Sequence, residues 1–324
     1  MSQGNAGCIR HHGRGLAAAA AMILLLGACA GDDGSPGPGD TPTDDPSAPA
    51  SIVKLVFIHH SVGSNWLGDG NGGLGLALRD NNYFVSDTNY GWGPDSIGDR
   101  TDIPDWPDWF TGASAPTYLA ALFTESGQHT NYSRLATDPG GENTVVMFKS
   151  CYPNSMLQGQ PDDAPSATPG YTVGHAKYVY GELLDGFRAH PGKLFVVVTA
   201  PPVADATYAA NARAFNEWLV NDWLRDAGYD VGNVAVYDFY NVLTSNGGSP
   251  DVNDLGATGG HHHRWRSGAV QHASAGGADV SAYAEGGDDH PSRAGSLKAT
   301  GEFVPVLNVF YHRWQAARAA AAAR

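Results

Sequence analysis

Five short apolar runs alternate with longer, more polar segments along most of this chain. Short apolar runs bounded by turn residues are typical of buried strands. Strands that alternate with helical segments predict a parallel sheet with right-handed crossovers and helices on both faces. The predicted fold class is therefore α/β, a three-layer α/β/α sandwich around a five-stranded parallel sheet. The predicted strands are Ile52–Ile58, Tyr83–Asp87, Thr144–Phe148, Leu194–Thr199 and Val234–Tyr237.

Helices are expected between these strands, and three long loops separate the remaining segments. The predicted helices are 73–79, 116–126, 173–190, 207–227 and a C-terminal helix from Ser292 that is interrupted near Pro305. The predicted loops are 89–115, 150–172 and 245–288.

Residues 1–29 have the composition of a secretory signal. Basic residues precede the apolar run from Leu16 to Leu26, which is too short to span a bilayer. The run ends in Leu26-Gly-Ala-Cys29, which resembles the bacterial lipoprotein box and implies a lipid on Cys29. The prediction is an exported, membrane-anchored lipoprotein, periplasmic or on the cell surface. An ordinary cleavable signal is the alternative.

The remainder of the chain divides into a linker and one domain. Residues 30–50 contain Gly, Pro, Ser, Thr, Ala and Asp and no large apolar side chain, so they predict a disordered acidic tether. Residues 51–324 show no second linker and predict one large α/β domain with long loops.

The formal net charge of −14 excludes nucleic acid as an expected partner, because phosphate binding needs a basic surface. Of the three cysteines, only Cys151 lies in the predicted domain, so no intrachain disulfide is expected there.

Polar clusters follow three of the predicted strands, and a fourth precedes the last helix. They are His59-His60-Ser61-Val62-Gly63, Asn89 to Asp95, Lys149 to Ser155, and Gly287-Asp-Asp-His290-Pro-Ser292. Functional groups of α/β folds gather at the carboxyl ends of the strands. Acyl transfer needs a nucleophile, a base and donors for the oxyanion, and these loops contain all three. A helix-capping role is the alternative for Ser61.

The four clusters, over most of 52–312, resemble the SGNH (GDSL-like) hydrolase superfamily. The resemblance implies that Ser61 is the nucleophile and His290 the general base. It also implies an oxyanion hole formed by the backbone N–H of Ser61, the side chain of Asn154 and a glycine of the second cluster. Gly93 is the preferred glycine, and Gly91 and Gly98 are alternatives.

The sequence departs from the family pattern at three points. His59-His60 replaces the usual Gly-Asp before the serine, and the third cluster lacks a glycine and an aspartate. Gly287 stands three residues before His290, where the family has aspartate. Asp288 is the preferred third member of the triad, since it can orient the imidazole. Asp289 and a Ser–His dyad remain alternatives.

Other roles compete for several of these residues. Asn154 can be a turn residue, Asp288 a solvated loop charge and Cys151 either a thiol nucleophile or a small buried side chain. His60 is predicted to contact substrate, with a buried structural role as the alternative. Neither metal nor cofactor is predicted. Four further histidines are interpreted as loop residues because consecutive histidines do not match zinc spacing; they are His261, His262, His263 and His272.

The second loop gives the prediction of substrate. Exposed aromatic rings beside carboxylates suit sugars, and Trp92 is predicted to contact substrate; the alternative is that Trp106 and Trp109 fasten the loop to the domain. The predicted function is a serine esterase that removes acyl, most simply acetyl, groups from a small-molecule or polysaccharide ester. A lipid esterase or thioesterase and an inactive glycan-binding lipoprotein are the alternatives. The oligomeric state is not predicted.

Overall fold

The computed structural model describes residues 44–247, 253–276, 279–285 and 288–323. The predicted signal and the predicted lipidation of Cys29 lie outside these residues. The fold described below belongs to a compact unit that spans residues 42–324.

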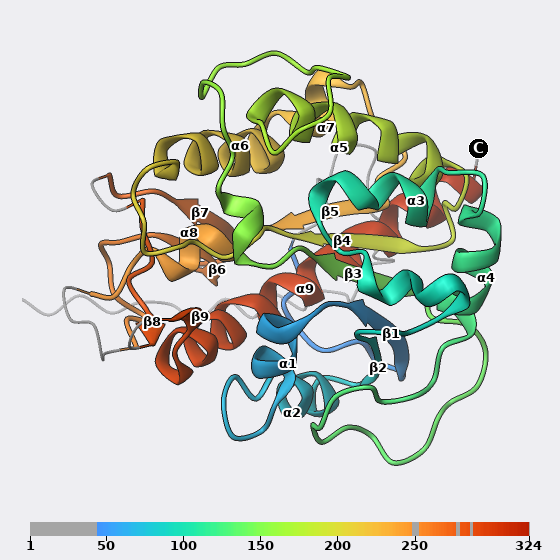
Figure 1. The fold of residues 1–324 in the computed structure, drawn as a ribbon. Helices are drawn as coiled ribbons and strands as arrows, with labels where there is room; N and C mark the ends of the chain where they lie inside the picture. Colours follow the sequence, from blue (N-terminus) through green and yellow to red (C-terminus); the bar gives the residue numbers. More distant parts are fainter. Residues whose placement is uncertain (1–43, 248–252, 277–278, 286–287, 324) are drawn as a thin grey trace, which may run out of the picture. The chain divides into compact units, whose positions relative to one another are not determined.

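The core of this unit is a parallel five-stranded sheet with the order β2-β1-β3-β4-β5 (Figure 1). This order is flavodoxin-like, and the α/β/α fold class predicted from the sequence is confirmed. All five predicted strands form within two residues of their expected ends. They are β1 (Val53–Ile58), β2 (Tyr83–Thr88), β3 (Val145–Lys149), β4 (Leu194–Val198) and β5 (Val234–Tyr237).

Alternate strand residues face two separate hydrophobic cores, each covered by its own helices (Figure 1). One face packs against α3 (Trp106–Phe110), α4 (Ala115–Thr124), α5 (Val173–Arg188), α6 (Ala209–Asn221) and α7 (Trp223–Asp226). The other packs against α1 (Ser61–Leu67), α2 (Leu74–Asp80), α8 (Phe239–Leu243) and α9 (Arg293–Ala322). Short 3-10 turns η1 (Pro94–Asp99), η2 (Ile103–Asp105) and η3 (Tyr152–Ser155) lie in the loops.

The prediction of a loop over 245–288 is wrong. This stretch contains two antiparallel hairpins, β6 (His262–Arg266) with β7 (Ala269–Ala273) and β8 (Ala284–Glu285) with β9 (Asp288–Pro291). Polar residues fill the buried positions of β6, so the apolar alternation that marks a strand is missing.

The predicted interruption of the last helix is also wrong, because α9 runs through Pro305 without a break. Proline removes one helical hydrogen bond, and the buried side chains around it hold the helix in place. These neighbours are Phe303, Val304, Val306 and Leu307.

The folded unit begins earlier than residue 51. The guanidinium of Arg313 on α9 binds the carboxylate of Asp44 at 2.6 Å, and the amide of Asn308 donates to the carbonyl of Pro46 at 2.9 Å. Residues 44–50 therefore contact α9 and are not part of a free tether. Among the described helices, none combines the length and the apolar character needed to cross a bilayer.

Candidate active site

Ser61 lies where β1 ends and α1 begins, at the carboxyl edge of the sheet. His60 still has extended backbone angles, φ −121° and ψ −155°, and Ser61 is the first helical residue. The cap position belongs to His60, whose side chain makes no capping bond, so the alternative cap role of Ser61 is not realised. The Ser61 hydroxyl is instead directed at β9, which lies beside the start of α1 (Figure 1).

The structure brings three of the predicted catalytic residues together in a chain of hydrogen bonds. The Oγ of Ser61 lies 2.9 Å from Nε2 of His290, and Nδ1 of His290 lies 2.7 Å from Oδ1 of Asp288. This order of hydroxyl, imidazole and carboxylate is the one that nucleophilic acyl transfer uses. The ring of Tyr152 packs edge-on against the imidazole, with centroids 5.1 Å apart, and limits its rotation.

The two adjacent aspartates of β9 have different partners. Asp288 binds both the imidazole and the backbone N–H of His290, and these hydrogen bonds lower the pKa of its carboxyl. Asp289 accepts a hydrogen bond at 2.8 Å from the N–H of Ala204 in the segment after β4. Of the two carboxylates, only Asp288 is hydrogen-bonded to the imidazole; Asp289 fastens β9 to the sheet's edge.

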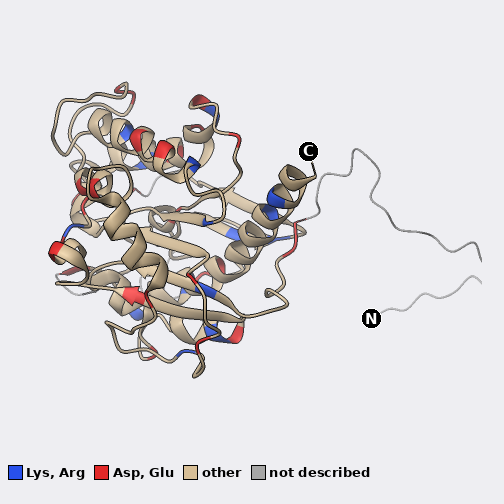
Figure 2. Cartoon of the chain, turned by 90° about the vertical axis from the view of Figure 1, so that its right-hand side faces the viewer, with Lys and Arg blue, Asp and Glu red and all other residues tan. Residues whose placement is uncertain are grey.

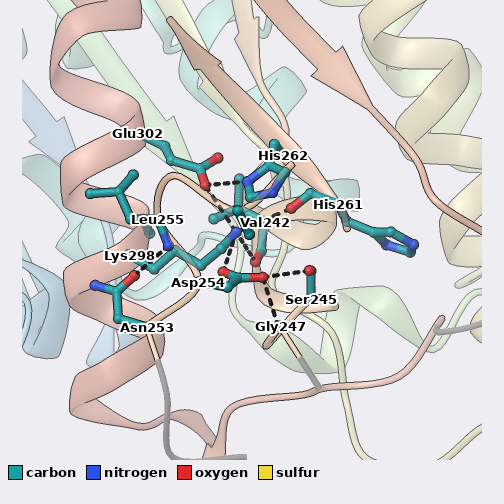
Figure 3. A network of polar contacts seen from close by, with 12 residues as sticks. Val242, Ser245, Gly247, Asn253, Asp254, Leu255, His261, His262, Lys298 and Glu302 are labelled. Atoms are coloured by element: carbon teal, nitrogen blue, oxygen red, sulfur yellow. Dashed lines mark hydrogen bonds and ion pairs between the residues drawn. The ribbon is translucent and has the colours of Figure 1, made fainter. Parts of the chain in front are cut away.

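A buried polar network anchors the segment that carries His290 (Figure 3). Nζ of Lys298 on α9 lies between the carboxylates of Asp254 and Glu302, at 3.3 Å and 3.0 Å. It also donates to the carbonyls of Val242, at 2.8 Å, and His261, at 3.1 Å. The lysine therefore joins α8, α9 and the chain between them.

This network is close to charge balance. His262 presents Nδ1 to Glu302 at 2.6 Å and Nε2 to the carbonyl of Gly259 at 3.3 Å, so both ring nitrogens face acceptors. Burial alone would raise the pKa of Glu302, but hydrogen bonds and charges from His262 and Lys298 lower it. Asp254 also accepts from the hydroxyl of Tyr283, at 2.9 Å, just before β8. The anchoring thus extends to the hairpin that carries His290.

His60, predicted to contact substrate, is instead a buried structural residue. Its Nε2 donates to the carbonyl of Gly98 at 2.5 Å, and its Nδ1 lies 2.9 Å from the hydroxyl of Thr101. Burial lowers the pKa of the ring. Both nitrogens are therefore engaged, and the ring joins the serine turn to the loop after β2. Its outer face stacks on Tyr90 at 3.9 Å.

The backbone of that loop distinguishes the three candidate glycines. The N–H of Gly91 donates to Asp99, and the N–H of Gly98 donates to the carbonyl of Trp92. The N–H of Gly93 has no acceptor within the described residues. Gly93 has φ +78°, a left-handed conformation that favours glycine. It is the glycine whose donor remains available to a ligand.

The amide of Asn154, expected to face the oxyanion, is occupied by the protein. Its nitrogen donates to Asp102 at 2.7 Å and to the carbonyl of Cys151 at 3.3 Å, while its oxygen accepts from the N–H of Ile103 at 2.7 Å. The side chain is buried and joins η3 to the start of η2. Asn154 therefore has a structural role here. The motif did not indicate this role, because the partner Asp102 lies far away in the sequence.

The tryptophans of the second loop are buried, which corrects the prediction that Trp92 contacts substrate. Trp92 stacks on Trp109 at 5.7 Å and donates to the carboxylate of Glu125. Trp106 donates to Ser150 and Trp109 to the carbonyl of Arg100. Their role is to fasten the loop to the domain. The exposed aromatic residue of this loop is Tyr90, with 63% of its surface accessible.

Cys151 contacts Ser61, which its interpretation as a small buried side chain does not imply. Its Sγ is 3.6 Å from the Oγ of Ser61, and the residue is half-buried. Cys151 follows β3, so its place at the carboxyl edge of the sheet was a usable signal for this contact. The thiol lies beside the Ser61 hydroxyl, and the imidazole of His290 is hydrogen-bonded to the serine.

The interpretation of the remaining histidine run as loop residues is wrong in part. His262 and His263 lie in β6 and His272 lies in β7, while His261 lies in the loop before β6. His261, His262 and His263 are buried and held by hydrogen bonds. Within the described part of the chain, no group of three or more His, Cys, Asp or Glu side chains is arranged to hold a metal ion.

Charged side chains are spread over the molecule. In the view of Figure 2, basic and acidic segments are interspersed along the helices and loops and are not gathered by sign.

Comparison with known proteins gives little similarity. No family model matches the chain, and no curated protein matches it. Among solved structures, it is similar to one titled "The active site of a carbohydrate esterase displays divergent catalytic and non-catalytic binding functions". The match has 13% identity and a TM-score of 0.29 and covers 59% of this chain. The chain spans 58% of the length of that protein.

Proposed function

We propose that this protein is a serine esterase of the SGNH type that removes acyl groups, most simply acetyl, from carbohydrate esters. The single observation that carries the proposal is the pair of contacts at His290, 2.9 Å to the Ser61 hydroxyl and 2.7 Å to Asp288. An imidazole held between a hydroxyl and a carboxylate can take the hydroxyl proton and return it to a leaving group.

The reaction proceeds in two halves. His290 removes the proton from Ser61 as Oγ attacks the ester carbonyl, and Asp288 stabilises the resulting imidazolium. When the tetrahedral intermediate collapses, His290 gives the proton to the alcohol and an acyl-enzyme remains. Water, activated by the same imidazole, then releases the acid.

Two backbone donors are proposed for the oxyanion, the N–H of Ser61 and the N–H of Gly93. The first N–H groups of a helix have no intrahelical partner, so the Ser61 N–H at the start of α1 is available. The Gly93 N–H is available because it has no acceptor within the described residues. Asn154 is left out of this role because its amide nitrogen already has two acceptors.

Two aromatic rings near the triad, the exposed Tyr90 and the half-buried Tyr152, support a sugar-bearing substrate. Tyr90 covers His60 next to the nucleophile, and Tyr152 packs against the catalytic imidazole. Flat rings can stack on sugar faces, and the half-exposed carboxylate of Asp288 adds a polar edge to the site.

A lipid substrate has less support. An apolar pocket of about 590 Å³ lies between α3, α4 and α5, but its lining includes Glu142 and His190. Those residues precede β3 and β4, so the pocket opens at the amino edge of the sheet, opposite Ser61. It is therefore not placed to receive the acyl chain of a bound ester. The hydrogen-bonded triad likewise argues against an inactive binding protein.

The proposal includes export and a lipid anchor on Cys29, which rest on the sequence of residues 1–29 alone.

The test is covalent labelling with a fluorophosphonate and turnover of a panel of acyl esters. We expect the wild-type protein to be labelled on one serine, Ser61→Ala to be neither labelled nor active, and acetylated sugars to be preferred over long-chain esters. Absence of labelling in folded wild-type protein would refute a serine hydrolase. Retained turnover in Ser61→Ala would refute the nucleophile, and release of fatty acid over acetate would favour the lipid esterase.

A further inference from the structure

A buried ion pair beneath Ser61 has no part in the mechanism above. His59 and Asp87 are both fully buried, and Nε2 of His59 lies 3.1 Å from Oδ2 of Asp87. Asp87 stands near the end of β2, which pairs with β1 in the sheet. Its other oxygen accepts from the N–H of His129 at 2.8 Å and the hydroxyl of Tyr132 at 3.0 Å. The carboxylate is therefore held on both sides.

Both nitrogens of the His59 ring face acceptor oxygens. Nδ1 lies 2.9 Å from the carbonyl oxygen of His60, and Nε2 faces Asp87. Since both partners are acceptors, the ring can bind both only when each of its nitrogens bears a hydrogen. Burial alone would raise the pKa of the Asp87 carboxyl, but the hydrogen bond and charge of His59 lower it.

The carbonyl that His59 binds belongs to the same peptide group as the N–H of Ser61. It also accepts from the N–H groups of Gly63, at 2.8 Å, and Ser64, at 3.1 Å. A trans peptide is planar, so fixing the direction of its carbonyl fixes its N–H in the opposite direction. A cation hydrogen-bonded to the carbonyl also draws electron density from the peptide and makes the N–H a stronger donor.

Gly63 supplies the space for this arrangement. A Cβ added at residue 63 would lie 2.3 Å from Cβ and 2.8 Å from Nδ1 of His59, closer than atoms can approach. The glycine after Ser61-Val62 therefore accommodates the imidazole under the first turn of α1.

We propose that His59 and Asp87 are positioning residues, which hold and polarise the 60–61 peptide so that the Ser61 N–H stabilises the oxyanion. The inference rests on the proposed function. Neither residue touches substrate; they act through the backbone. The histidine that replaces the usual residue of the family pattern thereby has a role: it adds a buried charge behind an oxyanion donor.

The experiment compares Asp87→Asn and the double variant His59→Asn/Asp87→Asn with wild-type protein. The double variant replaces the ion pair by two neutral amides, which avoids a lone buried charge. Loss of one oxyanion donor lowers kcat about 10²–10³-fold, so a weakened donor should lower it about 30-fold in the double variant and about 5-fold in Asp87→Asn. KM for p-nitrophenyl acetate should change less than about 2-fold, because ground-state binding does not use the charge.

Two further measurements separate positioning from a general structural defect. The affinity for methylboronic acid, which forms a tetrahedral adduct on the serine, should fall in proportion to kcat/KM. The end-point fluorophosphonate titre should remain that of wild type. Tyr132→Phe is the matched control, since it removes a neutral hydrogen bond to Asp87 and leaves His59 in place; its kcat should change less than about 2-fold.

The outcomes are distinct. Wild-type kcat and boronate affinity in the double variant would overturn the inference and leave the esterase intact. A titre that falls together with kcat would also overturn it, because the role would then be structural. If the double variant does not fold, Asp87→Asn decides on the same criteria. Wild-type protein that shows no Ser61-dependent turnover would refute the proposed function and this inference with it.

Discussion

The two halves of the candidate site are supported in different ways. The serine arm, residues 59–67, is the direct continuation of β1 into α1, and its buried charges are one pair, His59 and Asp87. The histidine arm, residues 244–291, leaves the sheet after α8 and returns at α9. In its described part it has only short hairpins, and several buried charges fasten it to α9.

The difference concerns where each arm obtains its rigidity. The serine arm inherits its position from the central sheet, because β1 is hydrogen-bonded on both sides, to β2 and β3. In its described part the histidine arm adds no strand to the central sheet, and it depends on polar side chains whose partners lie on other elements. We therefore expect the two arms to respond differently to substitution and to pH.

The largest expected effect is on the stability of the histidine arm. Lys298→Met leaves Asp254 and Glu302 buried without their shared cation and removes the donor to two carbonyls. Breaking a buried charge network in this way costs about 3–5 kcal/mol of unfolding free energy. Urea titration followed by tryptophan fluorescence measures the loss.

A matched lysine tests whether the network, and not lysine truncation, is responsible. Lys193 is also buried, but its carboxylate partner Glu142 is exposed. Lys193→Met should cost less than about 2 kcal/mol, since the stranded carboxylate stays hydrated. Equal losses in the two variants would mean that the histidine arm needs no special anchoring.

The contrast between the arms also explains how much could be predicted from sequence. The strands and the serine turn follow from local patterns: an apolar run, then His59-His60-Ser61, then a glycine. The hairpin β6–β7 escaped prediction because its buried positions hold His262, His263 and Arg264, whose burial depends on partners such as Glu302 about 40 residues away.

The same limit applied to individual site residues. The hydrogen-bonded series of Ser61, His290 and Asp288 could be predicted because each residue lies beside the boundary of a predicted strand or helix. The burial of Trp92 and the engagement of Asn154 depend on Glu125 and Asp102, which no spacing rule connects to them. The contact of Asp87 with His59 was not predicted, although Asp87 ends a predicted strand and its neighbour β1 leads directly into Ser61.

The next expected effect is on catalysis within the histidine arm. Asp288→Asn should lower kcat/KM about 10²-fold, because the imidazole loses its negatively charged partner. The loss is smaller than for a fully buried triad, since 56% of the Asp288 side chain is exposed and solvent screens its charge. Steady-state hydrolysis of p-nitrophenyl acetate measures it.

Asp289→Asn is the paired control. Its Oδ1 binds a backbone N–H, which an asparagine oxygen can also accept, so kcat/KM should fall less than about 3-fold. The opposite ranking of the two variants would assign the triad to Asp289.

A smaller effect is expected in the serine arm. Gly63→Ala pushes a methyl group into the ring of His59, and overpacking of this kind costs about 1–3 kcal/mol. The unfolding free energy and kcat should both fall, because the imidazole is displaced from the 60–61 peptide. Gly70→Ala is the control, since nothing lies within 4 Å of the added Cβ, and it should stay within about 0.5 kcal/mol of wild type. Equal stability of the two variants would show that the turn tolerates the methyl group.

The smallest expected effect is on how the unfolding free energy depends on pH, through a buried histidine of the histidine arm. Burial lowers the pKa of His263 on β6 to about 3, and its Nδ1 accepts from the N–H of Asp238. Between about pH 6.5 and pH 3 the unfolded state binds a proton that the folded state does not, so stability falls as pH falls. This histidine should cost about 1–2 kcal/mol at pH 5 relative to pH 7.5. His263→Asn keeps an acceptor for Asp238 and should show a correspondingly smaller loss between the two pH values. Equal pH slopes in wild type and variant would mean that acid acts on the protein elsewhere than at this hairpin.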